Sequence, residues 1–225
     1  QDARDYRIGL EDGVKGLRIA YSADLGYAEV EPEIAALVKK AALRFAELGA
    51  HVEEADPGFE NAGPMFVTHW FAGAASLLKA FTPAQQELID PGLREVAAEG
   101  AKIGTLDYLD AVQKRGQLGV LMNRFHEKYD LLLTPTLPLA AFEAGREVAH
   151  LLKEKRWTDW SPFSYPFNLT QQPAASIPCG LTKKGLPVGL HIVGPRYADA
   201  LVLRAARAFE SLQPIALPDL AKLRK

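Results

Sequence analysis

Residues Phe167 to Val193 read FNLTQQPAASIPCGLTKKGLPVGLHIV, and this stretch decides the fold of the chain. It opens with a loop rich in Pro and Gln. Two β-type runs follow: Ala174 to Pro178 consists of small and β-branched residues leading to a proline, and Leu186 to Val193 places five apolar residues in eight positions. A few residues that include Gly185 separate the two runs, and this pattern predicts a β-hairpin.

The segments before this hairpin alternate between strand-like and helix-like patterns. Residues 1–16 are polar and read as a lead-in, Leu17 to Ser22 is a short β-type run, and His51 to Ala55 alternates as a second strand. Between these strands, apolar residues from Ile34 to Leu48 recur with helical spacing, and Gly49 is a natural C-cap. This order of strand, helix and strand predicts a parallel pair of strands.

The remaining segments also mix the two kinds of pattern, which indicates an α/β fold. Thr105 is placed to cap the helix that follows it. Helices are expected over residues 63–81, Pro83 to Ala98, Thr105 to Lys128 and Ala198 to Leu212. A buried strand is expected over Tyr129 to Thr134, and a long loop with room for a short helix over 138–160.

Composition and charge narrow the classes of partner. The chain has 225 residues, of which 48% are hydrophobic and 24% charged, and its formal net charge is −2. This balance is ordinary for a globular protein and gives no reason to expect nucleic acid or a membrane as a partner. Cys179 is the only cysteine, which excludes an internal disulfide and suits a reducing, cytoplasmic location. The chain starts at Gln1 rather than at Met, so we expect it to be a piece of a longer protein.

A search for catalytic constellations yields two weak candidates. Ser76 and Lys79 lie one helical turn apart, so the Lys amine could act as base for the Ser hydroxyl, although this pair is common by chance and its companion motifs are absent. Cys179 could act as a thiolate nucleophile, but a lone cysteine in a strand is more often a small buried hydrophobe. The sequence has no metal-type spacing of His and no glycine-rich nucleotide loop. The residues alone therefore predict an α/β domain without a catalytic centre of its own.

Several blocks of the sequence resemble one enzyme family. FNLTQQPAASIPCG, together with the later GLPVGLHIVGPRYADALVLRAARAFE, closely resembles the C-terminal signature of the amidase signature family, and YDLLLTPTLP resembles the strand and turn before that signature. VKGLRIAYSADLG is similar to the segment that follows the family's catalytic region. The resemblance extends from about Gly16 to Pro214. It implies a mixed β-sheet covered by helices, as in the C-terminal half of that fold, with residues 1–225 as one part of the domain.

The resemblance also implies a reaction, the hydrolysis of a carboxamide by a Ser–cis-Ser–Lys triad without a metal or an organic cofactor. The family carries this triad in its N-terminal half, and no stretch here matches it, so no catalytic residue is carried over. We therefore expect the chain alone to be inactive. Its expected partners are a small-molecule amide and the missing N-terminal half, and an exposed sheet edge or apolar face could instead lead it to form a homodimer.

By resemblance, one wall of the substrate pocket lies in this chain. The implied residues are the turn after the buried strand, the start of the hairpin block and two aromatic residues of the helix over 63–81: Thr134, Pro135, Thr136, Phe167, Asn168, Leu169, Trp70 and Phe71. Packing in the core is an equally good interpretation of the two aromatic residues of the helix.

Three alternatives stay open. Amidotransferase subunits that act on tRNA-linked Glu or Asp belong to the same family and hold the amino acid partly with an acidic residue shortly before the Asn-Leu pair. Residues Ser161 to Tyr165 contain no carboxylate, and the nearest is Asp159, which favours an amidase for neutral or apolar amides. The other two alternatives are a non-catalytic binding protein on the same fold and an independent hydrolase that uses Ser76 and Lys79.

Overall fold

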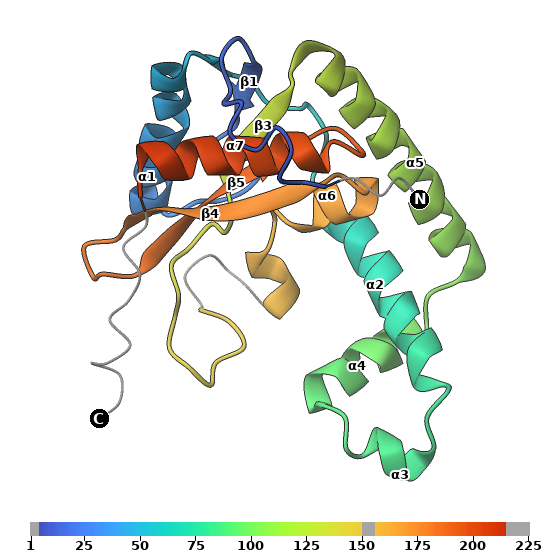
Figure 1. Cartoon of the computed structure of the whole chain (residues 1–225). Coiled ribbons are helices and arrows are strands. Elements are labelled where there is room, and N and C mark those ends of the chain that lie inside the picture. Colours follow the sequence, from blue (N-terminus) through green and yellow to red (C-terminus); the bar gives the residue numbers. More distant parts are fainter. Residues whose placement is uncertain (1–4, 150–155, 215–225) are drawn as a thin grey trace.

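The computed structural model describes residues 5–149 and 156–214, and its strands form a five-stranded sheet in the order β2-β1-β3-β5-β4 (Figure 1). β1 pairs in parallel with β2 and β3, whereas β5 pairs antiparallel with β3 and β4. The sheet is therefore mixed, and the predicted parallel pair and hairpin are both confirmed. The strands are β1 (Arg18–Tyr21), β2 (His51–Glu54), β3 (Leu131–Pro135), β4 (Ala174–Leu181) and β5 (Pro187–Val193).

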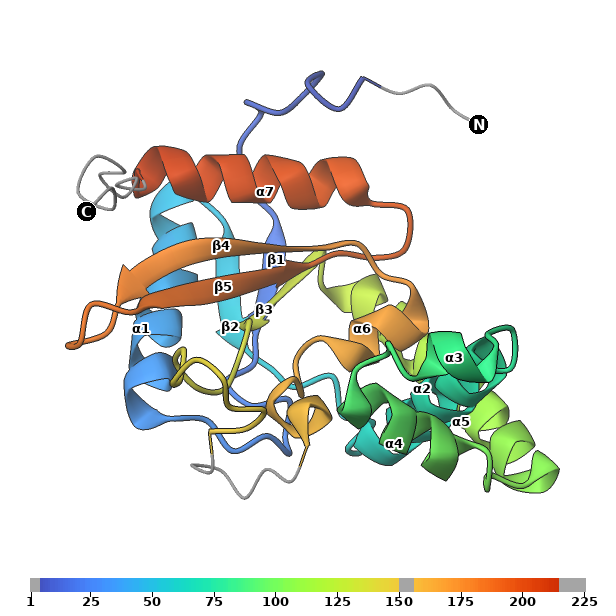
Figure 2. The ribbon, with the colours of Figure 1, turned by 90° about the horizontal axis from the view of Figure 1, so that it is seen from below.

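One face of the sheet is covered by α1 (Pro32–Leu43), the 3-10 helix η1 (Arg44–Leu48) and α7 (Asp199–Leu212). Figure 2 shows α7 running along β4 and β5. The aromatic rings of η1 and α7 stack with their centroids 5.5 Å apart. Gly49 follows η1 in the left-handed conformation with φ 82°, as expected of a glycine C-cap. The buried side chains of this core include Ile19, Val38, Phe45, Leu133, Ile177, Leu190, Ile192, Val202 and Phe209.

Helices cover only part of the opposite face. α5 (Thr105–Lys128) and α6 (Tyr165–Thr170) pack there against the side chains of Leu132 and Val193. Toward the hairpin, the loop over residues 136–142 and the 3-10 helix η2 (Trp157–Trp160) lie over the sheet instead.

None of the helices in the described ranges combines the length and the apolar character that spanning a bilayer requires.

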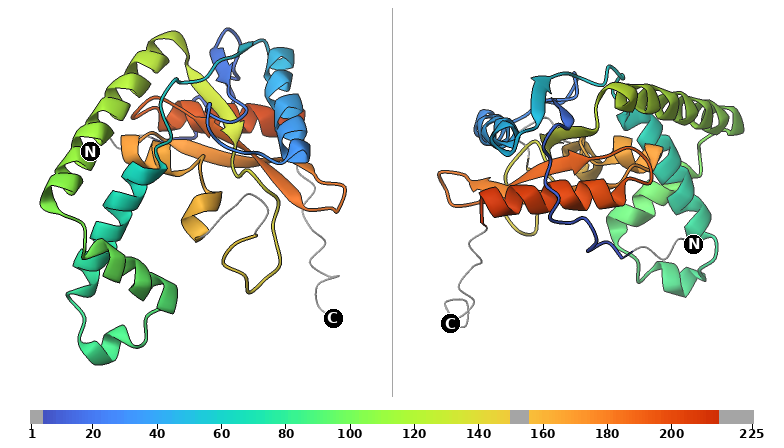
Figure 3. Two further views of the ribbon diagram at one scale, coloured as in Figure 1. Left: turned by 180° about the vertical axis from the view of Figure 1, so that it is seen from behind. Right: turned by 45° about the horizontal axis from the view of Figure 1, so that its top comes forward.

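α2 (Gly63–Leu78), α3 (Pro83–Gln86) and α4 (Pro91–Gly100) form an arm that projects from the sheet, with α3 at its tip (Figures 1 and 3). The arm has a small core of its own, separate from the two cores on the sheet. Its buried side chains are Phe71, Ala74, Leu78, Val96 and Ala97.

The single helix predicted from Pro83 to Ala98 is wrong, because the structure has two helices there. Pro91 has no backbone N–H to donate to the preceding turn, so it cannot continue α3 and instead begins α4. Asp90 is the N-cap, and its side chain accepts a hydrogen bond from the backbone N–H of Leu93 at 3.1 Å.

Two smaller expectations also fail. The N-cap of α5 is Gly104, and Thr105 is the first helical residue. Part of the expected Pro- and Gln-rich loop is helical, since α6 runs to Thr170 and Gln171 ends it at φ 60°. A helix this short is not stable by itself, and burial of its Tyr165 and Phe167 rings supplies the stabilisation that local sequence does not reveal.

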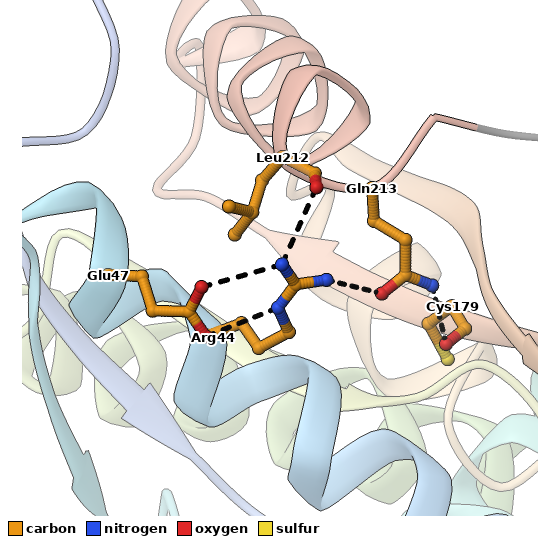
Figure 4. Close-up of polar contacts among 5 residues, drawn as sticks. All are labelled: Arg44, Glu47, Cys179, Leu212 and Gln213. Carbon is orange, nitrogen blue, oxygen red and sulfur yellow. Dashed lines mark hydrogen bonds and ion pairs between the residues drawn. The ribbon is translucent and has the colours of Figure 1, made fainter.

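A β-bulge in β4 shapes the edge of the sheet. The pairing with β5 shifts between Pro178 and Gly180, which leaves Cys179 without a ladder partner. The Gln213 side chain compensates, because its Nε2 donates to the Cys179 carbonyl at 3.0 Å (Figure 4). Arg44 fixes that amide by donating to Gln213 Oε1 at 2.8 Å, and it also donates to the Leu212 carbonyl at the end of α7 at 3.4 Å.

We expect Gln213→Met to lower the free energy of unfolding by about 1–2 kcal/mol. Methionine keeps the bulk of the side chain but leaves the Cys179 carbonyl without this donor and removes one of the acceptors of the Arg44 guanidinium. Urea unfolding measures the effect, and Gln113→Met, at an exposed position of α5, is the matched control with an expected change below about 0.5 kcal/mol. Equal losses in the two variants would show that the Gln213 amide contributes nothing specific.

Candidate functional site

Three polar side chains form a row across β3, β5 and β4. In the sheet register, Thr134 pairs with His191, and His191 pairs with Ser176. Successive side chains of a strand point to opposite faces, so these three share the face away from α1 and α7. Their apolar neighbours, Leu133 and Ile192 among them, point into the core beneath those helices.

A further hydroxyl, that of Thr136, lies one step toward the hairpin turn and meets Ser176 of this row. Thr136 Oγ1 and Ser176 Oγ are 2.7 Å apart and form a hydrogen bond. Gly189 of β5 lies between them, and a Cβ atom there would be 2.6 Å from Thr136 Oγ1 and 2.7 Å from Ser176 Oγ. The absence of a side chain at Gly189 is therefore what allows the two hydroxyls to meet.

These hydroxyls open into a cavity of about 530 Å³ at the carboxyl end of β3. This size and this position are typical of small-molecule sites in α/β sheets. The walls are apolar and aromatic, and the rings of Phe142 and Trp160 meet nearly edge to face at 6.0 Å. None of the described residues that line the cavity is charged; they are Ile34, Thr136, Leu137, Leu139, Ala140, Ala141, Phe142, Trp160, Ser176, Pro178, Pro187, Val188 and Gly189.

The loop that forms one wall of the cavity is fixed by the start of α1. The Glu31 backbone N–H donates to the Pro138 carbonyl at 2.8 Å. In return, the Ala140 backbone N–H donates to Glu31 Oε2 at 3.3 Å. These bonds hold the segment after β3 over the sheet and satisfy backbone groups that the loop would otherwise leave unpaired.

His191 is neutral beneath the cavity at neutral pH. It is 8% exposed, and burial lowers the pKa of its imidazole from 6.5 to about 4. Thr134 Oγ1 lies 3.4 Å from His191 Nδ1 and donates its own hydrogen to the Pro135 carbonyl at 2.8 Å. The Phe167 ring packs 5.6 Å from the imidazole. The row thus forms an uncharged floor.

The structure places three of the eight predicted pocket residues at the cavity or against His191 below it. Thr136 lines the cavity, and Thr134 and Phe167 contact His191 just below it. Pro135 is buried in β3, and its register partner Leu190 points into the α1 and α7 core. Leu169 is buried at the end of α6, where its carbonyl accepts a hydrogen bond from Arg115 Nε at 2.7 Å.

The other three predicted residues lie apart from the cavity. Asn168 is exposed on α6, and Phe71 is 5% exposed in the core of the arm. Trp70 is 47% exposed, and its ring meets Trp157 of η2 edge to face at 5.8 Å. Since Trp160 of the same short helix lines the cavity, η2 connects Trp70 to the cavity wall.

Ser176, Gly189, His191, Phe142 and Trp160 are missing from the sequence-based prediction. The first three carry a readable signal, since they alternate with Ile177, Leu190 and Ile192 of the hairpin and so belong to its other face. Phe142 and Trp160 lie in an irregular segment whose path no local pattern specifies.

The two weak nucleophile candidates lie away from this cavity. Cys179 is 5% exposed, and burial raises the pKa of its thiol to about 11, so the thiolate is disfavoured and the interpretation as a buried hydrophobe is supported. Ser76 and Lys79 are both exposed on the arm. Within the described ranges, no group of three or more His, Cys, Asp or Glu residues is arranged to hold a metal ion.

Comparisons with known proteins converge on one family. The model of the Amidase family matches residues 1–203. An acylamidase of Rhodococcus erythropolis is 36% identical over 207 residues, which cover 89% of this chain and 43% of that protein. A glutamyl-tRNA(Gln) amidotransferase subunit of Moorella thermoacetica is 34% identical over 92% of this chain and 46% of its own length. The chain thus spans about half the length of the curated relatives it matches.

Solved structures agree on the fold. A bacterial aryl acylamidase of the amidase signature family superposes with a TM-score of 0.82 and 29% identity, over 94% of this chain and 46% of that one. The structure of 6-aminohexanoate cyclic dimer hydrolase gives the same TM-score at 23% identity, over 98% of this chain and 50% of that one. At that identity the second match supports the fold alone.

Proposed function

The chain belongs to the Amidase family, and from this premise we propose that it forms one wall of the substrate pocket of an amidase that hydrolyses neutral carboxamides. In the complete enzyme, water would cleave the C–N bond of the amide to give a carboxylic acid and ammonia or an amine. The Ser–cis-Ser–Lys triad implied by the family would come from a segment outside this chain, and the chain alone would be inactive.

The uncharged cavity carries this proposal. Its aromatic and aliphatic walls suit an apolar acyl or aryl group, because burial of such a group is favourable and no charge is left unpaired. The Thr136 and Ser176 hydroxyls are its polar groups, and they can donate to or accept from the amide. The neutral floor at His191 adds no charge that would favour an ionic substrate.

The predicted pocket residues take two roles in this proposal. Thr136 would line the cavity, and Thr134 and Phe167 would support its floor through their contacts with His191. Pro135 and Leu169 would act indirectly, since Pro135 lies in β3 between the two threonines and Leu169 lies at the end of α6. Trp70 supports η2 from the arm, Asn168 faces the side on which the catalytic segment would lie, and Phe71 keeps the arm folded.

A glutamyl-tRNA(Gln) amidotransferase is the second candidate, because several relatives are named as subunits of that enzyme. The cavity favours the amidase, since an amino-acid substrate needs a countercharge. Asp159 is the carboxylate nearest in sequence to the Asn-Leu pair, and it already accepts hydrogen bonds from the Arg156 backbone N–H at 3.1 Å and from Thr158 Oγ1 at 3.3 Å. Glu31, at the loop of the cavity, accepts from the Ala140 backbone N–H.

A chimera tests the proposed function. This chain replaces the matched segment of the Rhodococcus erythropolis acylamidase, and the hydrolysis of aryl anilides and primary amides is followed by release of the amine or of ammonia. We expect turnover by the chimera and none by the isolated chain. A folded chimera that leaves neutral amides intact, or that acts only with tRNA-linked substrate and partner subunits, would contradict the proposal.

Within that chimera, we expect Gly189→Ala to lower kcat/KM at least tenfold while the protein stays folded. The new Cβ would force apart the Thr136 and Ser176 hydroxyls and narrow the cavity. The two oxygens can rotate away, but Thr136 Cβ, 3.1 Å from the new Cβ, must shift slightly, so the free energy of unfolding should fall by about 1–2 kcal/mol. Gly73→Ala is the control, since Gly73 lies on α2 of the arm with no atom near its Cβ position, and the activity of this variant should not change. Unchanged activity of Gly189→Ala would place the substrate elsewhere.

A further inference from the structure

α5 carries two apolar faces, and only one of them is buried. Ala111, Leu118, Met122 and Phe125 point into the molecule. On the other side of the helix, Leu106, Leu109, Val112 and Val120 are 81%, 52%, 43% and 52% exposed. Helical spacing places these four on one stripe with Gly116, roughly opposite the buried face. We call the part from Leu109 to Val120 the α5 stripe.

The α5 stripe is uncharged and open at its glycines. Its members are Leu109, Val112, Gly116 and Val120, with Gly119 at its border, and no atom lies within 4 Å of the Cβ position of either glycine. At a rise of about 1.5 Å per residue, the stripe is about 16 Å long. Glycines in a helix face let a second backbone approach closely, and a helix with apolar residues on both faces is normally covered on both.

Hollows on both sides continue this surface. Val120 and Gly116 line a cavity of about 1240 Å³ toward Ala55 and Pro57, and they also line one of about 390 Å³ toward the end of α6. The second hollow includes Leu169 of α6. Figures 1 and 3 show α5 along the border of the molecule, where another chain can reach it.

We propose that the α5 stripe is the docking surface for the catalytic segment of an amidase-family polypeptide. This inference rests on the proposed function, and it names the surface through which the two parts join. The curated relatives extend over more than half of their length beyond the match, so they contain a segment large enough to cover the stripe. A partner seated there would also reach Leu169 at the end of α6, a residue that the family resemblance assigns to the substrate pocket. A second copy of this chain is the competing occupant.

Co-expression with a defined partner tests the docking surface. The complete chain, carrying an affinity tag, is expressed together with the part of the Rhodococcus erythropolis acylamidase that it does not match, and the ratio of the two polypeptides is measured after purification. The test variant is Val112→Glu with Val120→Glu, which places two charges on the stripe. The control is Leu77→Glu with Leu203→Glu, where the exposed fractions are similar at 58% and 41%. Circular dichroism establishes that each variant is folded.

We expect the wild-type chain and the control to retain the acylamidase segment at a one-to-one ratio, and the stripe variant to retain at least tenfold less. Equal retention by both variants, or no retention by the wild type, would overturn the inference. Light scattering adds a further outcome: a wild-type dimer that the stripe variant converts to a monomer, with segment binding intact, would assign the stripe to a second copy and also overturn it. Retention of the acylamidase segment without amide hydrolysis would contradict the proposed function but not the docking surface, so failure of one proposal can be distinguished from failure of the other.

Discussion

Gly100→Ala will destabilise the arm by about 3 kcal/mol or more. Gly100 is the last residue of α4 and lies against the backbone of α2. A Cβ atom there would be 1.9 Å from the Phe71 carbonyl oxygen and 2.3 Å from its carbonyl carbon. These are backbone atoms of a helix and cannot rotate away, so the two helices must separate and expose the small core between them.

The same substitution at Gly73 is the matched control. Gly73 lies in α2 with no atom near its Cβ position, so alanine should stabilise the helix by about 0.5–1 kcal/mol. Amide hydrogen exchange resolves both effects, because the arm can open locally while the sheet stays folded. We expect Gly100→Ala to lose protection in α2 and α4 only. Protection equal to that of the wild type would show that the contact between α2 and α4 tolerates a methyl group at residue 100.

The second large effect is a loss of stability in acid that originates at His191. Burial lowers the pKa of this imidazole in the folded protein from 6.5 to about 4. Between these two pH values, the unfolded chain binds a proton at His191 that the folded chain does not bind. The stabilising effect of the neutral ring is fully present above pH 6.5 and is lost progressively between pH 6.5 and 4, by about 3 kcal/mol in total. His126 acts in the same direction, since burial lowers its pKa as well.

His191→Gln separates this effect from the titration of other groups. Glutamine keeps a polar side chain beside Thr134 but does not titrate. Urea unfolding at intervals from pH 8 to pH 4 should show that the wild type loses about 3 kcal/mol relative to the variant across that range. Parallel profiles of the two proteins would mean that His191 is hydrated or charged in the fold.

Local patterns predict the elements well where one residue type dominates the geometry. Gly49 ends the first helical segment as expected, and the turn at Gly185 joins the two strands of the hairpin. The failures follow from context. Apolar spacing continues across Pro91 and so predicts a single helix, whereas the missing N–H forces a new start. The pattern around α6 predicts a loop, because the stability of this helix comes from the burial of Tyr165 and Phe167.

The sequence predicts the cavity only at its Thr136 side. Ser176 and Gly189 belong to strands that pair across the sheet, and their meeting with Thr136 depends on the register of three strands at once. Trp70 and Phe71 illustrate the opposite case. Both are candidates for pocket or core by sequence, and the structure buries Phe71 in the arm and leaves Trp70 beside η2.

The stretch from Phe167 to Val193 by itself determined the hairpin, carried much of the family resemblance and favoured a buried Cys179, because alternation, turn residues and small side chains act over a few positions. Only the tertiary structure decided that Gln213 satisfies the bulge at Cys179, that Gly189 lets two hydroxyls meet, and that α5 keeps an apolar stripe in solvent. Each of these depends on groups far apart in the chain, and the free energy of such contacts follows from packing geometry that no local pattern encodes.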